Sequence, residues 1–327
     1  MNIIGLSYNH SVTYLAVGIQ NGYLIYSLEP NIEKIQFTEK NGGVGIMKLL
    51  HKTNISLLVG GGTNPFCSPE TLILWDDFLK KSVIEIQINE PIKNVFISQD
   101  RIVIILKKKI DVFNFNGSLI GTMTTYINEL GLCSLWVDDN KTTLVTLGTK
   151  KGEICIWKLN LSEIKNIEAH NSNIDALAIS QDGKLIATAS ETGTLIRIFN
   201  TESGEKLYEF RRGTKSAKIY DLCFNNAANL LVCCSDSGTV HIFDLYKDIK
   251  DSKNIQSYLS GAKNYLPNYF SSQWGFKQIY LECSGKMICG FDSNNILHVT
   301  TYEGKYFKIT GENFDDIKMD NLHTFEK

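Results

Sequence analysis

Two adjacent arginines, Arg211 and Arg212, are the residues whose type and position first suggest chemistry in this chain. They lie between two similar stretches, TASETGTLIRIF at residues 188–199 and SDSGTVHIF at residues 235–243. A guanidinium group is always charged, and its planar fork of N–H donors suits bidentate contacts to phosphate or carboxylate. Because neighbouring side chains on a strand point to opposite sides, we expect each arginine to serve a different site, one toward each stretch.

Hydroxyl groups recur at one spacing in both stretches. The Ser-x-x-x-Thr pattern occurs at Ser190 and Thr194, and again at Ser235 and Thr239. A cationic or potentially cationic residue follows each copy, Arg197 three residues after the first and His241 two residues after the second. Hydroxyls donate to phosphate oxygens, and histidine adds a donor or, near its usual pKa of about 6.5, a proton. If His241 contacts a phosphate, we therefore expect binding to strengthen as the pH falls from about 7.5 to about 6.

Simpler interpretations of the same residues stay open. The two arginines could form ion pairs with acidic neighbours or lie in solvent, and the two serines could satisfy turn amides only. His170 could be a structural histidine. With a period of two residues, Arg197 and His241 would face opposite ways unless one stretch carries a bulge or the longer arginine reaches round. The two sites are therefore expected to be unequal.

Short strand-like runs repeat along the whole chain with a period of about 40 residues, which is typical of propeller blades. Each unit reads as an apolar run, a turn, an apolar run, a glycine-containing turn and a β-branched run ending in an aromatic residue. Seven such units predict an all-β, seven-bladed β-propeller of WD-repeat type over residues 1–327, rather than a two-sheet sandwich. The chain starts in an inner strand. The seventh unit supplies its own outer strand, since it reads as KQIYLEC, KMICGF, ILHVTTY and KYFKIT. We therefore expect closure without a shared N-terminal strand.

Composition limits the possible functions. The chain has 327 residues, of which 43% are hydrophobic, and this is ample for a core. Its net charge of -2 argues against a general nucleic-acid binder. No apolar run approaches the length of a bilayer span, and the N-terminus does not resemble a signal peptide. The eight scattered cysteines indicate free thiols rather than disulfides or a metal site. The usual catalytic motifs are absent, so we expect no enzyme activity, no cofactor and no metal.

One connection of about thirty residues, at 246–275, interrupts the repeat. Loops of this length inside a compact repeat are usually functional or disordered. Lysines and acids fill its first part, and its later part carries aromatic residues without a long apolar run. This composition is typical of a segment that lies in a membrane interface, although a flexible insert is the alternative.

The repeats resemble degenerate WD repeats, with Ala169-His170 in place of Gly-His and Cys155-Ile156-Trp157 in place of the terminal Trp-Asp. More specifically, the residues FRRG at 210–213 are similar to the signature of the PROPPINs, β-propellers that bind polyphosphoinositides and include the WIPI proteins. The similarity is strong from about His170 to Phe276 and extends to the whole chain as a seven-unit layout.

The resemblance implies binding of phosphatidylinositol 3-phosphate and phosphatidylinositol 3,5-bisphosphate at two sites flanking the double arginine. The first site would use His170, Thr188, Ser190, Gly193, Thr194, Arg197 and Arg211. The second would use Arg212, Gly213, Ser235, Thr239 and His241. In the family the long sixth-blade loop enters the bilayer, and the corresponding residues here are Ile255, Tyr258 and Leu259.

The resemblance also implies a peripheral membrane adaptor in autophagy and endolysosomal trafficking. Such a protein would be a cytoplasmic monomer, recruited to autophagosomal precursor, endosomal or vacuolar membranes. Autophagy proteins would bind loops of the second and third blades, a region that contains the loop at residues 64–69. The alternative is a WD-repeat protein–protein scaffold that has kept the signature for structural reasons without binding lipid.

Overall fold

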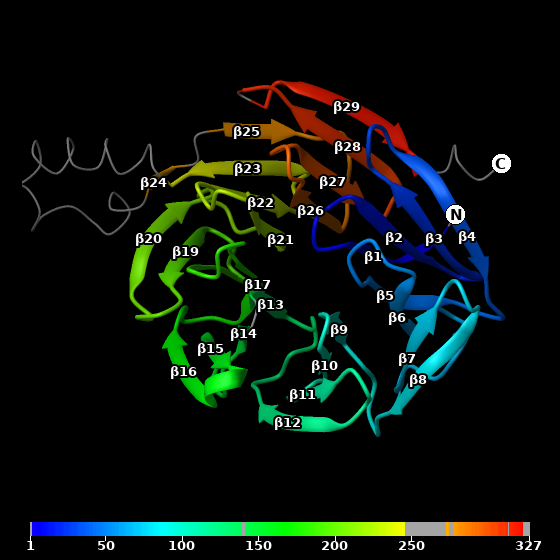
Figure 1. Ribbon diagram of the computed structural model, residues 1–327. Coiled ribbons are helices and arrows are strands. Elements are labelled where there is room, and N and C mark those ends of the chain that lie inside the picture. The colour runs from blue at the N-terminus through cyan, green and yellow to red at the C-terminus, as the bar shows by residue number, and fades with distance from the viewer. Residues whose placement is uncertain (1, 139–140, 246–272, 275–276, 313, 323–327) are drawn as a thin grey trace, which may run out of the picture. The chain divides into compact units, whose positions relative to one another are not determined.

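The described part of the chain consists of β-strands joined by turns and loops. The computed structural model describes residues 2–138, 141–245, 273–274, 277–312 and 314–322. Within these ranges it contains no α-helix and a single 3-10 turn, at Leu159–Leu161. The strands form seven sheets, each a run of antiparallel strands consecutive in the chain except where noted below (Figure 1). We call each sheet a blade and number the blades along the chain.

Each blade has four strands in meander order. Blades one to three are β1 (Ile3–Tyr8), β2 (Tyr14–Ile19), β3 (Gly22–Ser27), β4 (Glu33–Glu39); β5 (Val44–Leu49), β6 (Ile55–Gly60), β7 (Thr71–Asp76), β8 (Lys81–Gln87); and β9 (Asn94–Ile97), β10 (Arg101–Ile105), β11 (Lys109–Asn114), β12 (Leu119–Thr124). Blades four and five are β13 (Cys133–Asp138), β14 (Lys141–Leu147), β15 (Glu153–Lys158), β16 (Glu163–Glu168); and β17 (Ile174–Ile179), β18 (Leu185–Ser190), β19 (Leu195–Asn200), β20 (Lys206–Arg211). Blades six and seven are β21 (Ile219–Phe224), β22 (Leu230–Ser235), β23 (Thr239–Asp244), β25 (Lys277–Tyr280); and β26 (Met287–Phe291), β27 (Leu297–Thr301), β28 (Lys305–Thr310), β29 (Asp316–Asn321).

The blades belong to two compact units. One unit comprises Met1–Cys133, Leu147–Lys150 and Cys283–Lys327, and it contains blades one, two, three and seven. The other comprises Ser134–Thr146 and Lys151–Glu282, and it contains blades five and six with most of blade four. Every residue of the two predicted lipid sites belongs to the second unit.

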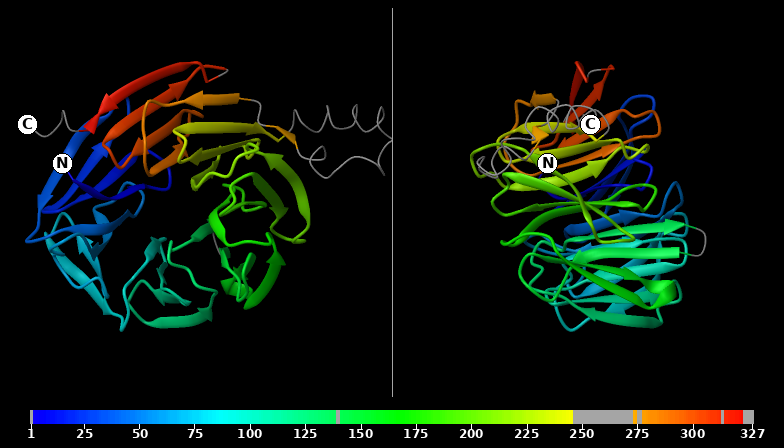
Figure 2. Two further views of the ribbon diagram at one scale, coloured as in Figure 1. Left: turned by 180° about the vertical axis from the view of Figure 1, so that it is seen from behind. Right: turned by 90° about the vertical axis from the view of Figure 1, so that its left-hand side faces the viewer.

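The outermost strand of the sixth and seventh blades differs from the prediction. The run KQIYLEC was assigned to blade seven, but β25 pairs antiparallel with β23 and completes blade six. The long connection hides this partnership, because it separates two strands that are neighbours in space. Blade seven instead ends with β29, which pairs with β28, the KYFKIT run that was predicted to be outermost. Blades one and seven each have four strands of their own, so the expected absence of a shared N-terminal strand is confirmed (Figure 2).

A short additional strand, β24 (Gln273–Trp274), joins blade five rather than blade six. It pairs in parallel with Phe210–Arg211 at the end of β20. The chain that leaves β23 therefore adds a fifth strand to the neighbouring blade before it returns to blade six as β25. The predicted sixth-blade loop at 246–275 falls largely outside the described residues, and its proposed membrane role stays a prediction.

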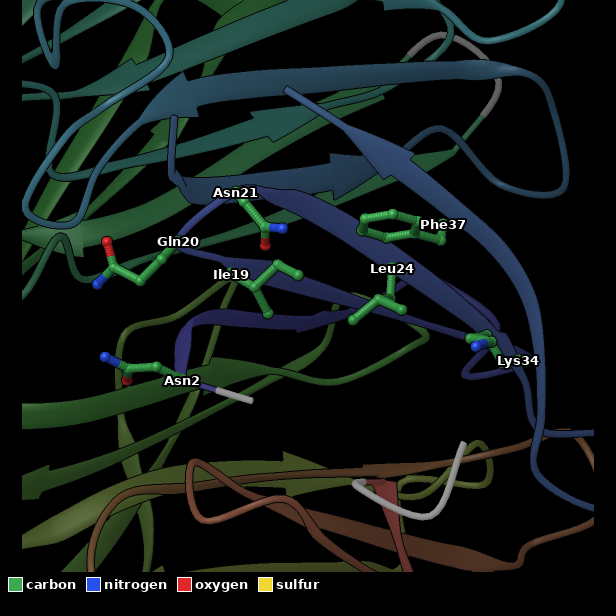
Figure 3. Close-up of a pocket in the computed structure, with 7 residues that line it drawn as sticks. All are labelled: Asn2, Ile19, Gln20, Asn21, Leu24, Lys34 and Phe37. Atoms are coloured by element: carbon green, nitrogen blue, oxygen red, sulfur yellow. The ribbon is translucent and has the colours of Figure 1, made fainter. Parts of the chain in front are cut away.

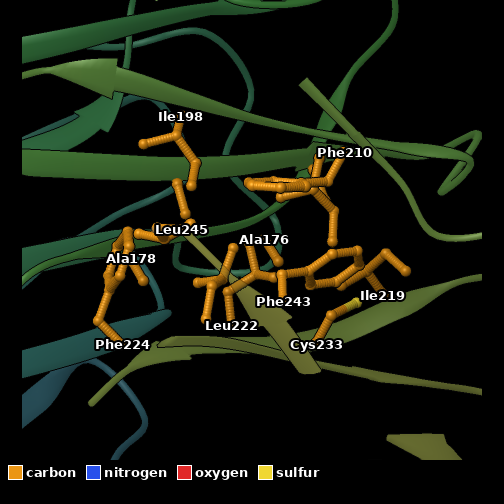
Figure 4. Close-up of a cluster of buried hydrophobic side chains, with 14 residues drawn as sticks. Ala176, Ala178, Ile198, Phe210, Ile219, Leu222, Phe224, Cys233, Phe243 and Leu245 are labelled. Carbon is orange, nitrogen blue, oxygen red and sulfur yellow. The ribbon is translucent and has the colours of Figure 1, made fainter. Parts of the chain in front are cut away.

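Apolar side chains of blades five and six form a shared core (Figure 4). Inner strands such as β18 and β22 are buried along nearly their whole length, because they are covered on both faces. Alanines of β17 and β18 leave room for two rings, Phe210 and Phe243, which are fully buried with centroids 5.1 Å apart. Tyr208 stacks on Phe210 with ring centroids 5.9 Å apart. The phenylalanine that precedes the double arginine thus anchors that segment in the core.

Phe210→Ala should lower the free energy of unfolding by about 3–5 kcal/mol, because it removes a fully buried ring and leaves a cavity. Leu207→Ala on the same strand is the matched control, since Leu207 is 40% exposed and should change stability by about 0.5 kcal/mol or less. Denaturant titration of the three proteins measures the difference. Equal midpoints for both variants would show that the ring is not part of the core.

Candidate functional site

The predicted lipid-binding residues gather at one end of blades five and six. Consecutive turns of an antiparallel meander alternate between the two ends of a sheet. The β18–β19 turn, the β22–β23 turn and the connections that enter and leave blade five therefore all lie at the same end. These four segments carry most residues of both predicted sites.

A hydrogen-bonded group forms around His170, in the connection that enters blade five. Its Nε2 lies 3.0 Å from the hydroxyl oxygen of Thr188, and both side chains are buried. Arg197 stands opposite Thr188 in the register of β18 and β19, and its Nη1 donates to the carbonyl of Ala169 at 2.6 Å. Its Nε donates to the carboxylate of Glu209 at 2.8 Å. The structure thus brings His170, Thr188 and Arg197 together as predicted, with Glu209 as an additional partner.

A second group forms around Arg212, whose side chain is 7% exposed. Its Nε donates to the carbonyl of Gly193 at 2.6 Å, and its Nη2 donates to the carbonyl of Lys215. The backbone N–H of Arg212 donates to the carbonyl of Thr194 at 2.9 Å. Arg212 therefore holds the β18–β19 turn of blade five against the connection that leads to blade six. Four of the five N–H hydrogens of a guanidinium point from its two terminal nitrogens, so donors remain for a further anion.

The two hydroxyl turns have the same construction. The hydroxyl of Ser190 lies 2.9 Å from that of Thr192, and the hydroxyl of Ser235 lies 2.9 Å from that of Ser237. A glycine with positive φ follows in each turn, Gly193 at 60° and Gly238 at 67°. Sequence reasoning missed Thr192, Ser237 and Gly238, although the shared pattern Ser-x-Thr/Ser-Gly-Thr contained the signal.

Arg197 and His241 would face opposite ways only if the two stretches had the same number of residues between the serine and the strand, and they do not. Arg197 pairs with Thr188 and His241 pairs with Cys233, and these partners each lie two residues before the serine of their turn. The difference in spacing arises in the turn, because β19 begins one residue after Thr194 whereas β23 begins at Thr239 itself. The two cationic positions are therefore equivalent in register.

The remaining predicted residues differ in their surroundings. Arg211 ends β20 opposite Leu195 and is partly exposed. Gly213 follows the double arginine, and a Cβ placed on it would meet no atom within 4 Å. At Gly193, in contrast, a Cβ would lie 1.8 Å from the carbonyl oxygen of Ala217. The glycine at 193 is therefore required by packing, whereas the one at 213 leaves an open approach to the backbone.

Electrostatics keep both histidines neutral. Burial and the nearby charge of Arg197 lower the pKa of His170 to about 4. Burial and the charge of Arg212 lower the pKa of His241 to about 4, and Nδ1 of His241 is buried without a hydrogen-bond partner among the described residues. The expectation that His241 gains its proton near pH 6.5 is therefore wrong for the free protein. The carboxylate of Glu209 also lies in this region, where it accepts hydrogen bonds from Arg197 and Lys206. Burial acts to raise the pKa of Glu209, but these hydrogen bonds hold it below its usual value.

Arginine is concentrated at this end of the two blades. The chain has four arginines among 33 basic residues, and three of the four are Arg197, Arg211 and Arg212. The proposed insertion residues Ile255, Tyr258 and Leu259 lie outside the described residues. None of the helical structure in the described part of the chain is long and apolar enough to span a membrane.

Comparisons with known proteins identify the family of this chain. The PROPPIN family model matches residues 2–285. This chain is a member of the PROPPIN family. It is 31% identical over 326 residues to autophagy-related protein 18e of Arabidopsis thaliana, which covers 98% of this chain and 87% of the relative. It is 33% identical over 301 residues to SVP1-like protein 2 of Pichia angusta, covering 88% of this chain and 84% of the relative.

Solved structures confirm the fold class of this PROPPIN as a seven-bladed β-propeller. Kluyveromyces lactis Hsv2 matches with a TM-score of 0.78 and 21% identity, covering 98% of this chain and 99% of the other. KlAtg21, solved in complex with the coiled-coil of AgAtg16, matches with a TM-score of 0.77 and 22% identity, covering 98% of each chain. At this level of identity the likeness shows the fold alone.

The first unit of this PROPPIN also contains a cavity. A cavity of about 320 Å³ in blade one is lined by Phe37, Leu24 and Ile19, with Lys34 as its single cationic residue (Figure 3). The loop at residues 64–69 joins β6 to β7, and the N–H of Phe66 donates to the carbonyl of Gly43 at 3.1 Å. This loop has no feature that identifies a partner.

The depressed histidine pKa values predict a loss of stability in acid. A histidine with a folded pKa of about 4 and an unfolded pKa of about 6.5 binds more protons when unfolded, so stability falls as the pH drops through that window. At about pH 5 each histidine should reduce the free energy of unfolding by about 2 kcal/mol relative to about pH 7.5. In His170→Gln/His241→Gln the decrease between these pH values, measured by denaturant titration, should be smaller. An unchanged decrease would contradict the assignment.

Proposed function

We propose that this PROPPIN is a phosphoinositide effector that binds phosphatidylinositol 3-phosphate and phosphatidylinositol 3,5-bisphosphate at two sites flanking Arg211 and Arg212. It then acts as a non-enzymatic peripheral membrane adaptor in autophagy and endolysosomal trafficking. The observation that carries the proposal is the repeated hydroxyl–glycine turn, present at the same end of two neighbouring blades with the arginine pair between the copies.

The proposed first site lies beside the turn of blade five. Its cationic residues would be Arg197 and Arg211, with hydroxyls of Ser190 and Thr194 as donors. Arg197 is held by Glu209 and by the carbonyl of Ala169, so its position is set before a ligand arrives. A fixed guanidinium loses less conformational freedom on binding, which favours affinity. The neighbouring carboxylate of Glu209 repels an anion. Binding of an anion at this site therefore depends on the hydrogen-bond donors that Glu209 does not occupy.

The proposed second site lies beside the turn of blade six. Arg212, Gly213, Ser235, Thr239 and His241 would contribute, with Arg212 supplying the charge. Because its pKa is about 4, His241 would act as a neutral donor at physiological pH. A phosphate dianion would raise that pKa, but from a starting value far below 6.5. We therefore expect vesicle binding to change little through His241 between about pH 7.5 and about 6.

The alternative is a protein–protein scaffold in which the double arginine is only structural. The bonds from Arg212 to Gly193 and Lys215 favour a structural role for this residue, and the burial of Phe210 does the same for the start of the signature. They do not account for Arg211, which is more exposed, or for the open approach at Gly213. The name of the Arabidopsis relative supports a role in autophagy for this chain as well.

Changing Arg211 and Arg212 together to Thr should reduce flotation with vesicles containing phosphatidylinositol 3-phosphate at least tenfold. Each lost charge-assisted contact is worth on the order of 1.5–3 kcal/mol. Vesicles containing unphosphorylated phosphatidylinositol give the background. Arg101→Thr is the matched control, because Arg101 belongs to blade three and pairs with the adjacent Asp100.

The buried contacts of Arg212 require a second variant, because its loss leaves the carbonyl of Gly193 unpaired and lowers stability by about 1–3 kcal/mol. Arg211→Thr alone avoids that loss and should weaken binding without removing it, since two sites on one membrane act with avidity. Full flotation of a folded double variant would overturn the lipid assignment and favour the scaffold.

The membrane-insertion proposal for Ile255, Tyr258 and Leu259 rests on the family resemblance and has its own test. Tyr258→Asp/Leu259→Asp should weaken vesicle binding at least tenfold, because each buried apolar side chain is worth roughly 1.5–3 kcal/mol. Capture of a soluble inositol phosphate should be unchanged in this variant. Parent-like flotation would show that the membrane anchor lies elsewhere, without affecting the headgroup sites.

A further inference from the structure

A second feature of the unit that contains blades five and six lies away from the arginine pair. A cavity of about 490 Å³ is formed by blade four together with two turns of blade five. These are the β17–β18 and β19–β20 turns, which lie at the end of blade five opposite to the β18–β19 turn. The cavity therefore does not belong to the proposed lipid sites. Its volume is within the range of ligand pockets in proteins.

The walls of the cavity are held in place by hydrogen bonds. Nε1 of Trp136 donates to the carbonyl of Gln181 at 3.0 Å, and its indole lies against the turn at Gly183. A Cβ on Gly183 would lie 2.5 Å from the indole ring, so only glycine fits this contact. Across the cavity, the N–H of Thr142 donates to Oδ1 of Asn160 at 3.1 Å. A fixed aromatic wall reduces the entropy lost when a ligand binds.

The charges that line the cavity do not balance. Three lysines face two carboxylates, Asp182 and Glu202. Lys158 pairs with Glu202 at 2.8 Å and with Glu163 at 3.3 Å, and Lys184 pairs with Asp182 at 3.4 Å. Lys141 forms no ion pair with a residue that the structure describes, although its charge helps to lower the pKa of Glu202. The lining thus carries one more positive than negative charge, which favours a ligand with a single negative charge, and the two carboxylates disfavour a ligand of high negative charge.

Apolar and polar groups accompany this charge. Leu161 is 69% exposed at the cavity, and with Trp136 it offers apolar surface. Thr201 is buried, and its hydroxyl has no partner among the described residues, so a polar ligand atom that reached it would gain a hydrogen bond without displacing one. The exposed side chains of Leu161 and Lys184 extend the surface beyond the cavity, which suits an extended chain better than a compact small molecule.

We propose that this cavity binds a short acidic peptide segment of a partner protein. The peptide places one carboxylate beside Lys141 and an aromatic or branched aliphatic side chain against Trp136 and Leu161. The two carboxylates of the cavity exclude peptides with dense negative charge, and the apolar walls exclude peptides that carry charge alone. Such a site would let the protein hold a partner while the opposite end of blade five stays available to a membrane.

The test uses the full-length protein and a fluorescein-labelled peptide, Gly-Ser-Glu-Asp-Phe-Leu-Gly-Ser, in a polarisation titration. We expect saturable binding, at least fivefold weaker for Lys141→Glu and at least tenfold weaker for Trp136→Ala. Lys81→Glu is the matched control, since this exposed lysine of blade two lies in the other unit and should change affinity less than twofold. Lys141 is exposed, so its variant keeps the test valid if Trp136→Ala does not fold.

Two companion peptides separate this site from general charge attraction. Replacing Phe and Leu of the peptide by Gly, or Glu and Asp by Lys, should each weaken binding at least fivefold. The proposal is overturned if the parent peptide shows no saturable binding, if Lys141→Glu binds it as the parent protein does, or if the glycine peptide binds equally well. Vesicle flotation of Lys141→Glu should match the parent protein, so failure here is distinguishable from failure of the lipid proposal.

Discussion

The hydrogen bond from Nε of Arg212 to the carbonyl of Gly193 is the interaction on which the proposed lipid-binding end depends. A buried guanidinium is costly unless hydrogen bonds compensate it, and here backbone carbonyls of two segments accept hydrogen bonds from its Nε and Nη2. The turn can approach so closely because Gly193 has no Cβ and adopts a positive φ. One charged side chain therefore fixes the turn of blade five and positions the following connection, and it adds to the burial that lowers the pKa of His241.

Successive residues of the FRRG signature alternate between buried and partly exposed positions. Phe210 and Arg212 are buried, whereas Arg211 between them is partly exposed. This is the pattern that a period of two residues produces at the end of a strand. The prediction that the two arginine side chains point to opposite sides of the strand agrees with this alternation. Their roles differ more than the sequence suggests, because Arg212 is also bonded to the backbone of the protein itself.

Most strands could be predicted because their signals are local: apolar runs, glycine turns and a terminal aromatic residue identify β17 to β19 and β21 to β23. Partners that are distant in sequence could not be read in the same way. The place of β25 in blade six was hidden by the long connection, and the pairing of Arg197 with Glu209 depends on the register between β19 and β20. The register of Arg197 and His241 stayed open between two alternatives, because it depends on one extra residue in a turn.

The strand β24 gives the long connection between β23 and β25 an unusual anchorage. Its main chain pairs with Phe210–Arg211, so the end of the connection is registered to the signature by backbone groups rather than by side chains. Loop-closure entropy grows slowly with length, by about 0.6 kcal/mol for each doubling. Evolution can therefore lengthen, shorten or rewrite the intervening residues at small thermodynamic expense while its exit point stays beside the arginines. The connection is in this sense interchangeable, and its sequence can diverge without any change to the blades.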